Sequence, residues 1–333
     1  MHALPGGQSP GWHADNRTTY GAFWDYKDFQ DRTVWLWEQI VERYKKNTWV
    51  AGYNPINEPC DPEHKRLPAF YARLEKAIRR IDPDHILWLD GNTFAMEFKG
   101  FTEVLPNCVY ALHDYSAMGF PDGEPYEGTD AQKDILVKQF GRKSEFHRAH
   151  KVPIWNGEFG PVYEAGAEHI NQQRYNLLGE QLKIYDKAKI SWSIWLYKDV
   201  GLQGMVHTSP DSAWNKLIQP WLEKKKRLQL DSWGKYPSEE VAKVMSPLIQ
   251  WINEVSPTAK EQYPTNWTLQ KHLERAVLQT FLSDSLQMEF AELFLGKDEA
   301  DLEELAQSFH FDQCLQREGL NKIMSEHAIL VGS

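Results

Sequence analysis

The stretch from Gly52 to Asp61, "GYNPINEPCD", places an asparagine and a glutamate directly before a proline. Apolar and aromatic residues run up to this point from Trp49, which is typical of a buried strand. The glutamate, Glu58, is therefore expected at the tip of a strand, just before the next helix. A carboxylate in that place suits acid–base chemistry if the chain supplies a second carboxylate to face it.

Strands and helices alternate on both sides of this stretch, from about residue 19 to residue 200. We predict strands at 49–56, 86–90, 108–115, 152–160 and 190–197, and helices at 28–46, 67–81, 130–149 and 167–187. The strands are near-continuous apolar runs, as in a parallel sheet covered on both faces. This alternation of strands and helices predicts an α/β fold, and we favour a (β/α)8 TIM barrel. The rival is an open doubly wound sheet, for which the sequence offers neither G-x-G-x-x-G nor a P-loop.

Polar residues collect where these strands end. In a TIM barrel the active site lies at that end of the strands, so these residues are the first candidates for a site. They are Asn57, Glu58, Asp90, His113, Asp114, Tyr115, Glu158, Tyr197 and Asp199.

The alternation of strands and helices stops beyond residue 205. Segments such as "SEEVAKVMSPLIQWINEV", 238–255, have helical periodicity, and no strand pattern recurs. We therefore expect a catalytic barrel over 1–204 and a helical extension or subdomain, structural rather than catalytic, over 205–333.

Composition excludes some classes of protein. The net charge of −10 argues against a nucleic-acid partner, because phosphate binding needs a basic face. No apolar run approaches the ~18 residues of a membrane span. The three cysteines are odd in number and widely spaced, so no disulfide framework or zinc pattern can be read. The 14 Trp and 14 Tyr suit core packing and the faces of sugar rings alike.

A second carboxylate, Glu158, lies in the strand predicted at 152–160. Glu58 and Glu158 are three strands apart, so they would face each other across the mouth of an eight-stranded barrel. Two such carboxylates suit cleavage of a glycosidic bond: one donates a proton to the leaving oxygen and the other, ionised, attacks the anomeric carbon. Each glutamate taken alone could equally be a salt bridge or a helix cap.

Neighbouring residues fit these two roles, proton donor and attacking carboxylate. The amide of Asn57 can bond a sugar hydroxyl, and a Tyr115 hydroxyl donating to Glu158 would hold that carboxylate ionised. His113 alternates with Tyr115 on one strand, so both point to one side. Trp195 could form a stacking floor for the sugar, or it could simply pack in the core.

Four motifs resemble strands four, six, seven and eight of glycoside hydrolase family 5: "NPINEP" (54–59), "ALHDY" (111–115), "IWNGEFG" (154–160) and "SWSIWLYKD" (191–199). "HALPGGQ" (2–8) resembles the end of the third strand of that family. The resemblance implies that Glu58 is the acid/base and Glu158 the nucleophile of a retaining mechanism. It also implies subsite-shaping roles for His2, Asn57, His113, Tyr115 and Trp195, and neither a metal nor a cofactor.

The family's first strand, and a second strand that carries an arginine near the nucleophile, have no counterpart in this sequence. Residue 1 falls inside the third strand of the family pattern. We therefore expect a barrel that lacks its first two strands, and a chain that on its own is inactive or nearly so, because open strand edges favour aggregation. The resemblance leaves localisation and oligomeric state open.

The function predicted is a retaining glycoside hydrolase acting on a carbohydrate substrate, namely β-linked glucosides or β-glucans. The alternative is a catalytically inactive, carbohydrate-binding remnant of such an enzyme. A transglycosylase using the same site differs only in how water is excluded. The loop 116–129 could block one end of a cleft and favour exo action, or it could be a solvated surface loop.

Overall fold

The computed structural model describes residues 1–231, 233, 238–265 and 267–328. The chain divides into two compact units. Unit 1 comprises Met1–Asp114, Gln139–Gly157 and Glu261–Thr268, and unit 2 comprises Tyr115–Lys138, Glu158–Lys260 and Leu269–Ser333.

The main sheet contains five strands in the order β1-β2-β3-β4-β5. They are β1 (Gly52–Tyr53), β2 (Ile86–Asp90), β3 (Cys108–His113), β4 (Ile154–Glu158) and β5 (Ser191–Trp192). β1 pairs parallel with β2, and β2 parallel with β3. Because the carboxyl ends of parallel strands meet at one edge, the residues that follow β1, β2 and β3 gather there.

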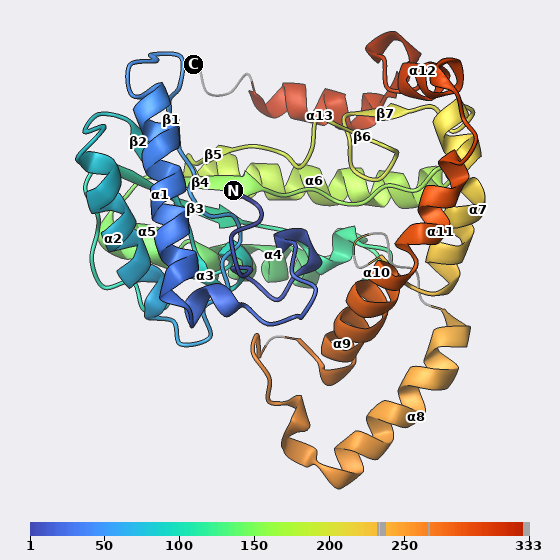
Figure 1. Ribbon diagram of the computed structural model, residues 1–333, viewed down its shortest axis with the longest axis horizontal. Coiled ribbons are helices and arrows are strands. Elements are labelled where there is room, and N and C mark those ends of the chain that lie inside the picture. Colours follow the sequence, from blue (N-terminus) through green and yellow to red (C-terminus); the bar gives the residue numbers. More distant parts are fainter. Residues whose placement is uncertain (232, 234–237, 266, 329–333) are drawn as a thin grey trace. The chain divides into compact units, whose positions relative to one another are not determined.

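Two amphipathic helices of unit 1 flank these strands, α1 (Lys27–Tyr44) and α2 (Arg66–Arg79) (Figure 1). The apolar face of α2 repeats at helical spacing, with Leu67, Phe70, Tyr71, Leu74 and Ile78 all buried. Pro68 lies in the first turn, where a missing N–H costs no internal hydrogen bond. The core of unit 1 is rich in aromatic rings that meet edge to face, such as Phe23 on Phe70.

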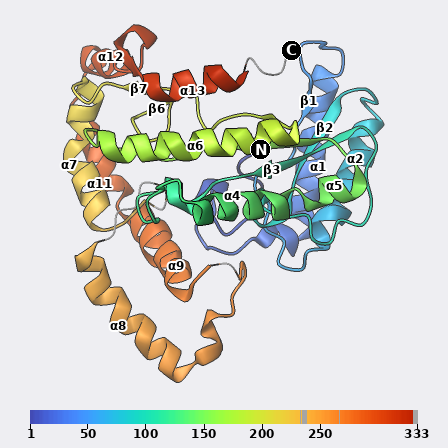
Figure 2. The ribbon, with the colours of Figure 1, turned by 180° about the vertical axis from the view of Figure 1, so that it is seen from behind.

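Unit 2 contains the long helix α6 (Glu168–Ala188), and α13 (Glu318–Ala328) runs alongside it, as Figures 1 and 2 both show. A second sheet has the order β6-β7-β8. It consists of β6 (Lys198–Asp199), β7 (Val206–Thr208) and β8 (Cys314–Gln316). β7 pairs parallel with β6 and antiparallel with β8, so Cys314–Gln316 join a sheet with the segment that follows β5.

The remaining elements are mostly short. The helices are α3 (Asn92–Ala95), α4 (Asp130–Lys143), α5 (Glu145–His150), α7 (Ala213–Arg227), α8 (Glu239–Val255), α9 (Leu269–Leu273), a π-helix (Glu274–Leu282), α10 (Ser283–Ser285), α11 (Gln287–Ala291) and α12 (Glu299–Gln307). Turns of 3-10 helix cover Trp12–Ala14, Ala22–Trp24, Ala117–Gly119, Pro257–Lys260, Glu292–Phe294 and Phe311–Gln313. In the part of the chain that the structure describes, no helix combines the length and the apolar character that crossing a bilayer requires.

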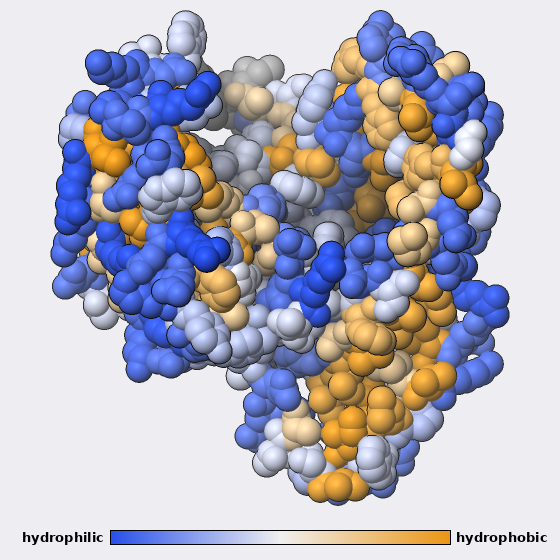
Figure 3. Space-filling model, in the orientation of Figure 1, coloured by the Kyte–Doolittle hydropathy of each residue, from blue (hydrophilic) through white to orange (hydrophobic). Residues whose placement is uncertain are grey.

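Apolar side chains gather over α8 and the helical segment that follows it in Figure 3. The exposed ones on α8 are Val244, Leu248, Trp251 and Val255. They recur every three or four residues, so α8 is amphipathic in the way its sequence predicts.

The predicted helices agree with the structure more closely than the predicted strands do. The helix predicted over 130–149 is broken at Ser144 into α4 and α5. The strands predicted at 49–56 and 190–197 are too long, since only Gly52–Tyr53 and Ser191–Trp192 are strands. The expectation of no strand beyond 205 is wrong, because β7 and β8 lie there.

The division into a barrel, 1–204, and an extension, 205–333, stays a prediction. One segment of the predicted extension, Glu261–Thr268, belongs to unit 1.

Gly52 offers a test of the parallel pairing of β1 with β2. A Cβ at Gly52 would lie 2.0 Å from the Ile86 carbonyl oxygen, whereas a Cβ at Gly141 in α4 meets nothing within 4 Å. We expect Gly52→Ala to lower the free energy of unfolding by about 1–3 kcal/mol. Gly141→Ala, the matched control, should leave it unchanged or raise it by up to about 1 kcal/mol. Urea unfolding measures both, and equal stability of the two variants would contradict the pairing described.

Candidate active site

Glu58 follows β1 and is held by its backbone. Its φ of 48° lies in the left-handed region, which a residue with a side chain adopts at a cost. The backbone N–H of Glu58 donates to Asp90 Oδ2 at 3.0 Å, and the Asn54 side chain donates to Asp90 Oδ1 at 2.8 Å. Asp90 is buried at the end of β2, so a fixed acceptor sets the direction in which Glu58 leaves the sheet.

Two imidazoles contact the Glu58 carboxylate, which is 12% exposed. Nδ1 of His113, from the end of β3, lies 2.8 Å from Oε1. Nε2 of His13, from the 3-10 turn Trp12–Ala14, lies 3.0 Å from Oε2. Both oxygens of the carboxylate therefore have a partner that can carry a proton.

These neighbours decide the charge of Glu58. Burial favours the neutral acid, but the hydrogen bonds and positive charges of His113 and His13 outweigh it and hold the pKa of Glu58 well below its usual range. Asp90 behaves in the opposite way, since burial raises the pKa of its carboxyl. Within unit 1, the ionised form of Glu58 is thus the favoured one.

His2 and Asn57 lie together beside Glu58. The Asn57 side-chain amide is 3.3 Å from Nδ1 of His2, and the Asn57 backbone N–H donates to the Met1 carbonyl at 3.0 Å. Gln8 ties the two segments by donating to the His2 and Asn57 carbonyls at 2.7 and 2.9 Å. The N-terminal residues thus run next to the segment after β1, as their resemblance to a neighbouring strand predicts, but they form no strand.

Glu158 ends β4 and belongs to unit 2. The Tyr115 hydroxyl donates to Glu158 Oε2 at 3.0 Å, which is the contact predicted from the sequence. The Tyr115 ring meets Trp233 edge to face at 5.0 Å, and Phe120 packs on the same tryptophan at 5.0 Å. Trp233 Nε1 donates to the Gln203 side chain, so the aromatic cluster that backs Tyr115 is itself anchored.

Trp195, the predicted stacking residue, also lies in unit 2. Its backbone N–H donates to the Phe159 carbonyl at 2.9 Å, which fixes it next to the strand that carries Glu158. The Trp195–Leu196 peptide bond is cis. The side chain is partly exposed, and its role as a sugar floor stays a prediction.

Sequence reasoning missed His13 and Trp233 and gave Asp90 no role. Asp90 was visible as a polar residue at a strand end, which is the signal that also identified Glu58. His13 and Trp233 belong to no sequence pattern whose spacing marks a contact with a residue far along the chain.

The family model for cellulase, glycosyl hydrolase family 5, matches residues 7–201. The chain belongs to glycosyl hydrolase family 5. It is therefore a glycoside hydrolase with the (β/α)8 TIM-barrel fold of that family, as the motifs predicted, and the retaining mechanism is general to family 5.

Relatives differ in the activity that their names state. A "Beta-xylosidase" of Phanerodontia chrysosporium is 46% identical over 343 residues, covering 99% of this chain and 72% of the relative. An "Endoglycoceramidase" of Hydra vulgaris is 25% identical, covering 52% of this chain and 33% of the relative. An "Endoglucanase C" of Acetivibrio thermocellus is 22% identical, covering 59% and 67%. Family 5 membership thus fixes the class of reaction and leaves the sugar open.

The contact of His13 with Glu58 gives a prediction for the pH profile. A general acid must be protonated, so if Glu58 has the acid role predicted from the motifs, the basic limb of kcat/KM falls where Glu58 loses its proton. His13→Gln removes the imidazole whose hydrogen bond and charge lower the pKa of Glu58, so this limb should move to higher pH. His310→Gln, at an exposed histidine, is the control and should leave the profile in place. A limb that stays or moves to lower pH with His13→Gln would contradict the contact.

Proposed function

We propose that this protein is a retaining β-glycosidase in which Glu158 is the nucleophile and Glu58 the acid/base. The observation that carries the proposal is the contacts that each carboxylate makes. Glu158 accepts a hydrogen bond from a neutral tyrosine hydroxyl, whereas Glu58 is contacted by two imidazoles that can themselves take up or release protons. A hydroxyl donor suits a carboxylate that stays ionised to attack, and titratable partners suit one that exchanges a proton.

The reaction has two steps. In the first, protonated Glu58 gives its proton to the leaving oxygen while a Glu158 oxygen forms a bond to the anomeric carbon and the glycosidic bond breaks. In the second, ionised Glu58 takes a proton from water, the water oxygen attacks the same carbon, and Glu158 leaves as a carboxylate. Configuration is retained because each step inverts it.

The low pKa of Glu58 in its own surroundings suits the second step. The first step requires a proton on Glu58, and a negative Glu158 nearby would raise the pKa by like-charge repulsion. Once Glu158 is glycosylated its charge is gone, and the pKa falls again. For the charge of Glu158 to change the pKa of Glu58 in this way, the two carboxyl groups must lie about 5 Å apart, the separation typical of retaining enzymes.

The identity of the sugar in the substrate is inferred from the relative named as a β-xylosidase, which matches almost the whole chain at 46% identity. We propose that β-xylosides are substrates together with the β-glucosides and β-glucans that the sequence predicts. Xylose and glucose differ by the hydroxymethyl group on C5, and one small group in a pocket changes kcat/KM by about 10–200-fold. Rates on 4-nitrophenyl β-xyloside, β-glucoside and β-galactoside with the full-length protein decide between them. Binding of sugars without hydrolysis of any of the three would favour the inactive remnant.

The roles of the two glutamates predict different kinetics for their amide variants. Glu158→Gln should lower kcat for every substrate by at least about 1,000-fold, since no glycosyl-enzyme can form. Glu58→Gln should spare the first step for dinitrophenyl glycosides, because good leaving groups need little protonation. Added azide should restore turnover of Glu58→Gln and give a glycosyl azide of retained configuration.

Glu103→Gln, at an exposed loop position, is the matched control and should behave as wild type. A glycosyl azide of inverted configuration from Glu58→Gln would show that the two roles are exchanged.

A further inference from the structure

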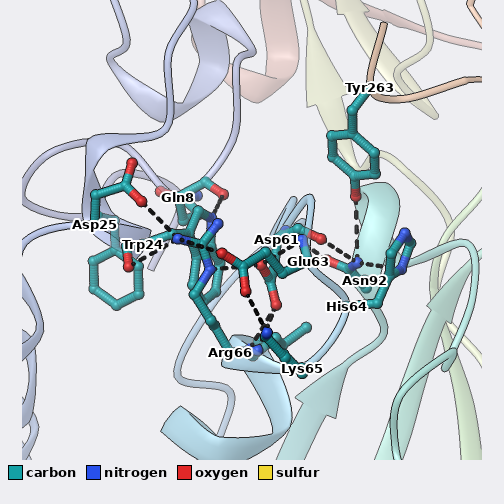
Figure 4. A network of polar contacts seen from close by, with 12 residues as sticks. Gln8, Trp24, Asp25, Asp61, Glu63, His64, Lys65, Arg66, Asn92 and Tyr263 are labelled. Carbon is teal, nitrogen blue, oxygen red and sulfur yellow. Dashed lines mark hydrogen bonds and ion pairs between the residues drawn. The ribbon is translucent and has the colours of Figure 1, made fainter. Parts of the chain in front are cut away.

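A segment from far along the chain docks in unit 1 near Glu58. This segment, Glu261–Thr268, lies outside the part that matches the family model. Its Tyr263 hydroxyl lies 2.8 Å from Thr93 Oγ1. The Asn92 side-chain amide donates to the same hydroxyl at 3.3 Å, as Figure 4 shows. The Tyr263 ring also meets the His64 ring edge to face, with 5.6 Å between ring centroids.

The turn on which the segment docks has an uncommon backbone. Thr93, Phe94 and Ala95 all have positive φ, at 54°, 61° and 57°. Three such residues in a row persist only where the surroundings hold them. The Thr93 hydroxyl donates to Glu97 Oε1 at 2.9 Å, and the Phe94 N–H donates to the Pro59 carbonyl at 3.2 Å. The turn is thus tied to the proline that directly follows Glu58.

Aromatic rings connect the docked segment to the carboxylate of Glu58. Trp267 stacks on Phe94, with ring centroids 4.9 Å apart and planes inclined by 20°. Phe94 contacts the His13 ring at 5.9 Å, and Trp12 meets the same ring edge to face at 5.8 Å. His13 lies 3.0 Å from Glu58. Trp12 is 45% exposed and Trp267 is partly exposed, so solvent reaches the residues at both ends of this row.

We propose that Trp267 and Trp12 bind the leaving group of the substrate, as two sides of an aromatic subsite that the segment 261–268 completes. The inference rests on the proposed role of Glu58, since an acid/base must lie at the leaving oxygen. The rings around its carboxylate therefore lie on the leaving-group side of the scissile bond. The ligand is a ring with a flat apolar face, either a second sugar or an aryl group, because aromatic side chains bind both by stacking.

The test compares leaving groups that have a ring with one that has none. Trp267→Ala and Trp12→Ala are made in the full-length protein, and kcat/KM is measured for β-xylobiose, 4-nitrophenyl β-xyloside and β-xylosyl fluoride. The step up to loss of the leaving group determines kcat/KM, and fluoride offers no surface on which to stack. The ratio of kcat/KM for a ring substrate to that for the fluoride should fall about tenfold in each variant. Trp267→Phe keeps a ring and should retain most of the ratio.

Trp251→Ala, at an exposed tryptophan on α8 in unit 2, is the matched control and should keep the wild-type ratio. A fall for xylobiose alone identifies a sugar, and a fall for the nitrophenyl substrate alone identifies an aryl group. Equal losses on ring substrates and fluoride would overturn the subsite and leave the proposed function standing. A wild-type protein that cleaves neither these xylosyl substrates nor the corresponding glucosyl fluoride and glucosides would overturn both. If Trp267→Ala fails to fold by circular dichroism, Trp12→Ala and Trp267→Phe decide the outcome.

Discussion

The hydrogen bond from the Glu58 backbone to the buried Asp90 carboxylate is the interaction on which the placement of Glu58, the proposed acid/base, depends. Glu58 leaves β1 with a φ of 48°, and a left-handed residue that is not glycine needs a fixed partner to stay there. Asp90 supplies it from the end of the neighbouring parallel strand, and Asn54 donates to the other oxygen of Asp90. Because two donors satisfy this carboxylate, its burial costs less than that of an unpaired charge. His113 and His13 can then meet a Glu58 side chain whose direction is already set.

Sequence reasoning predicted the elements that depend on local pattern. β2 was predicted to the residue, since an apolar run ends at Asp90, and α2 was predicted within two residues because its buried face repeats at helical spacing. The strand predicted from Trp49 failed at both ends, because Trp49 is 95% exposed and Pro55 has no N–H to continue a ladder. β8 was not predicted because Leu315 and Gln316 are exposed and form no apolar run.

The candidate site, too, contains residues that local sequence patterns predicted and contacts that they could not predict. The motifs placed Glu58, His113, Tyr115 and Glu158 at strand ends, and the Tyr115 contact with Glu158 followed from that placement. The approach of His13 to Glu58 and the docking of 261–268 beside Phe94 could not be predicted. In both cases a segment outside the predicted helices and strands contacts residues that are distant in sequence. The periodicity of a helix does not predict the position of the segment that follows it. Family membership gives the class of reaction, whereas these segments add contacts around Glu58 and Phe94.

The central claim is that Glu158 forms the covalent bond to the sugar. A 2-deoxy-2-fluoro β-xyloside or β-glucoside with a good leaving group slows both steps and lets the glycosyl-enzyme accumulate. Digestion of the labelled full-length protein, followed by mass spectrometry, should place one sugar on the peptide that contains Glu158. A label on Glu58 instead, or no label together with a hydrolysis product of inverted configuration, would contradict the account.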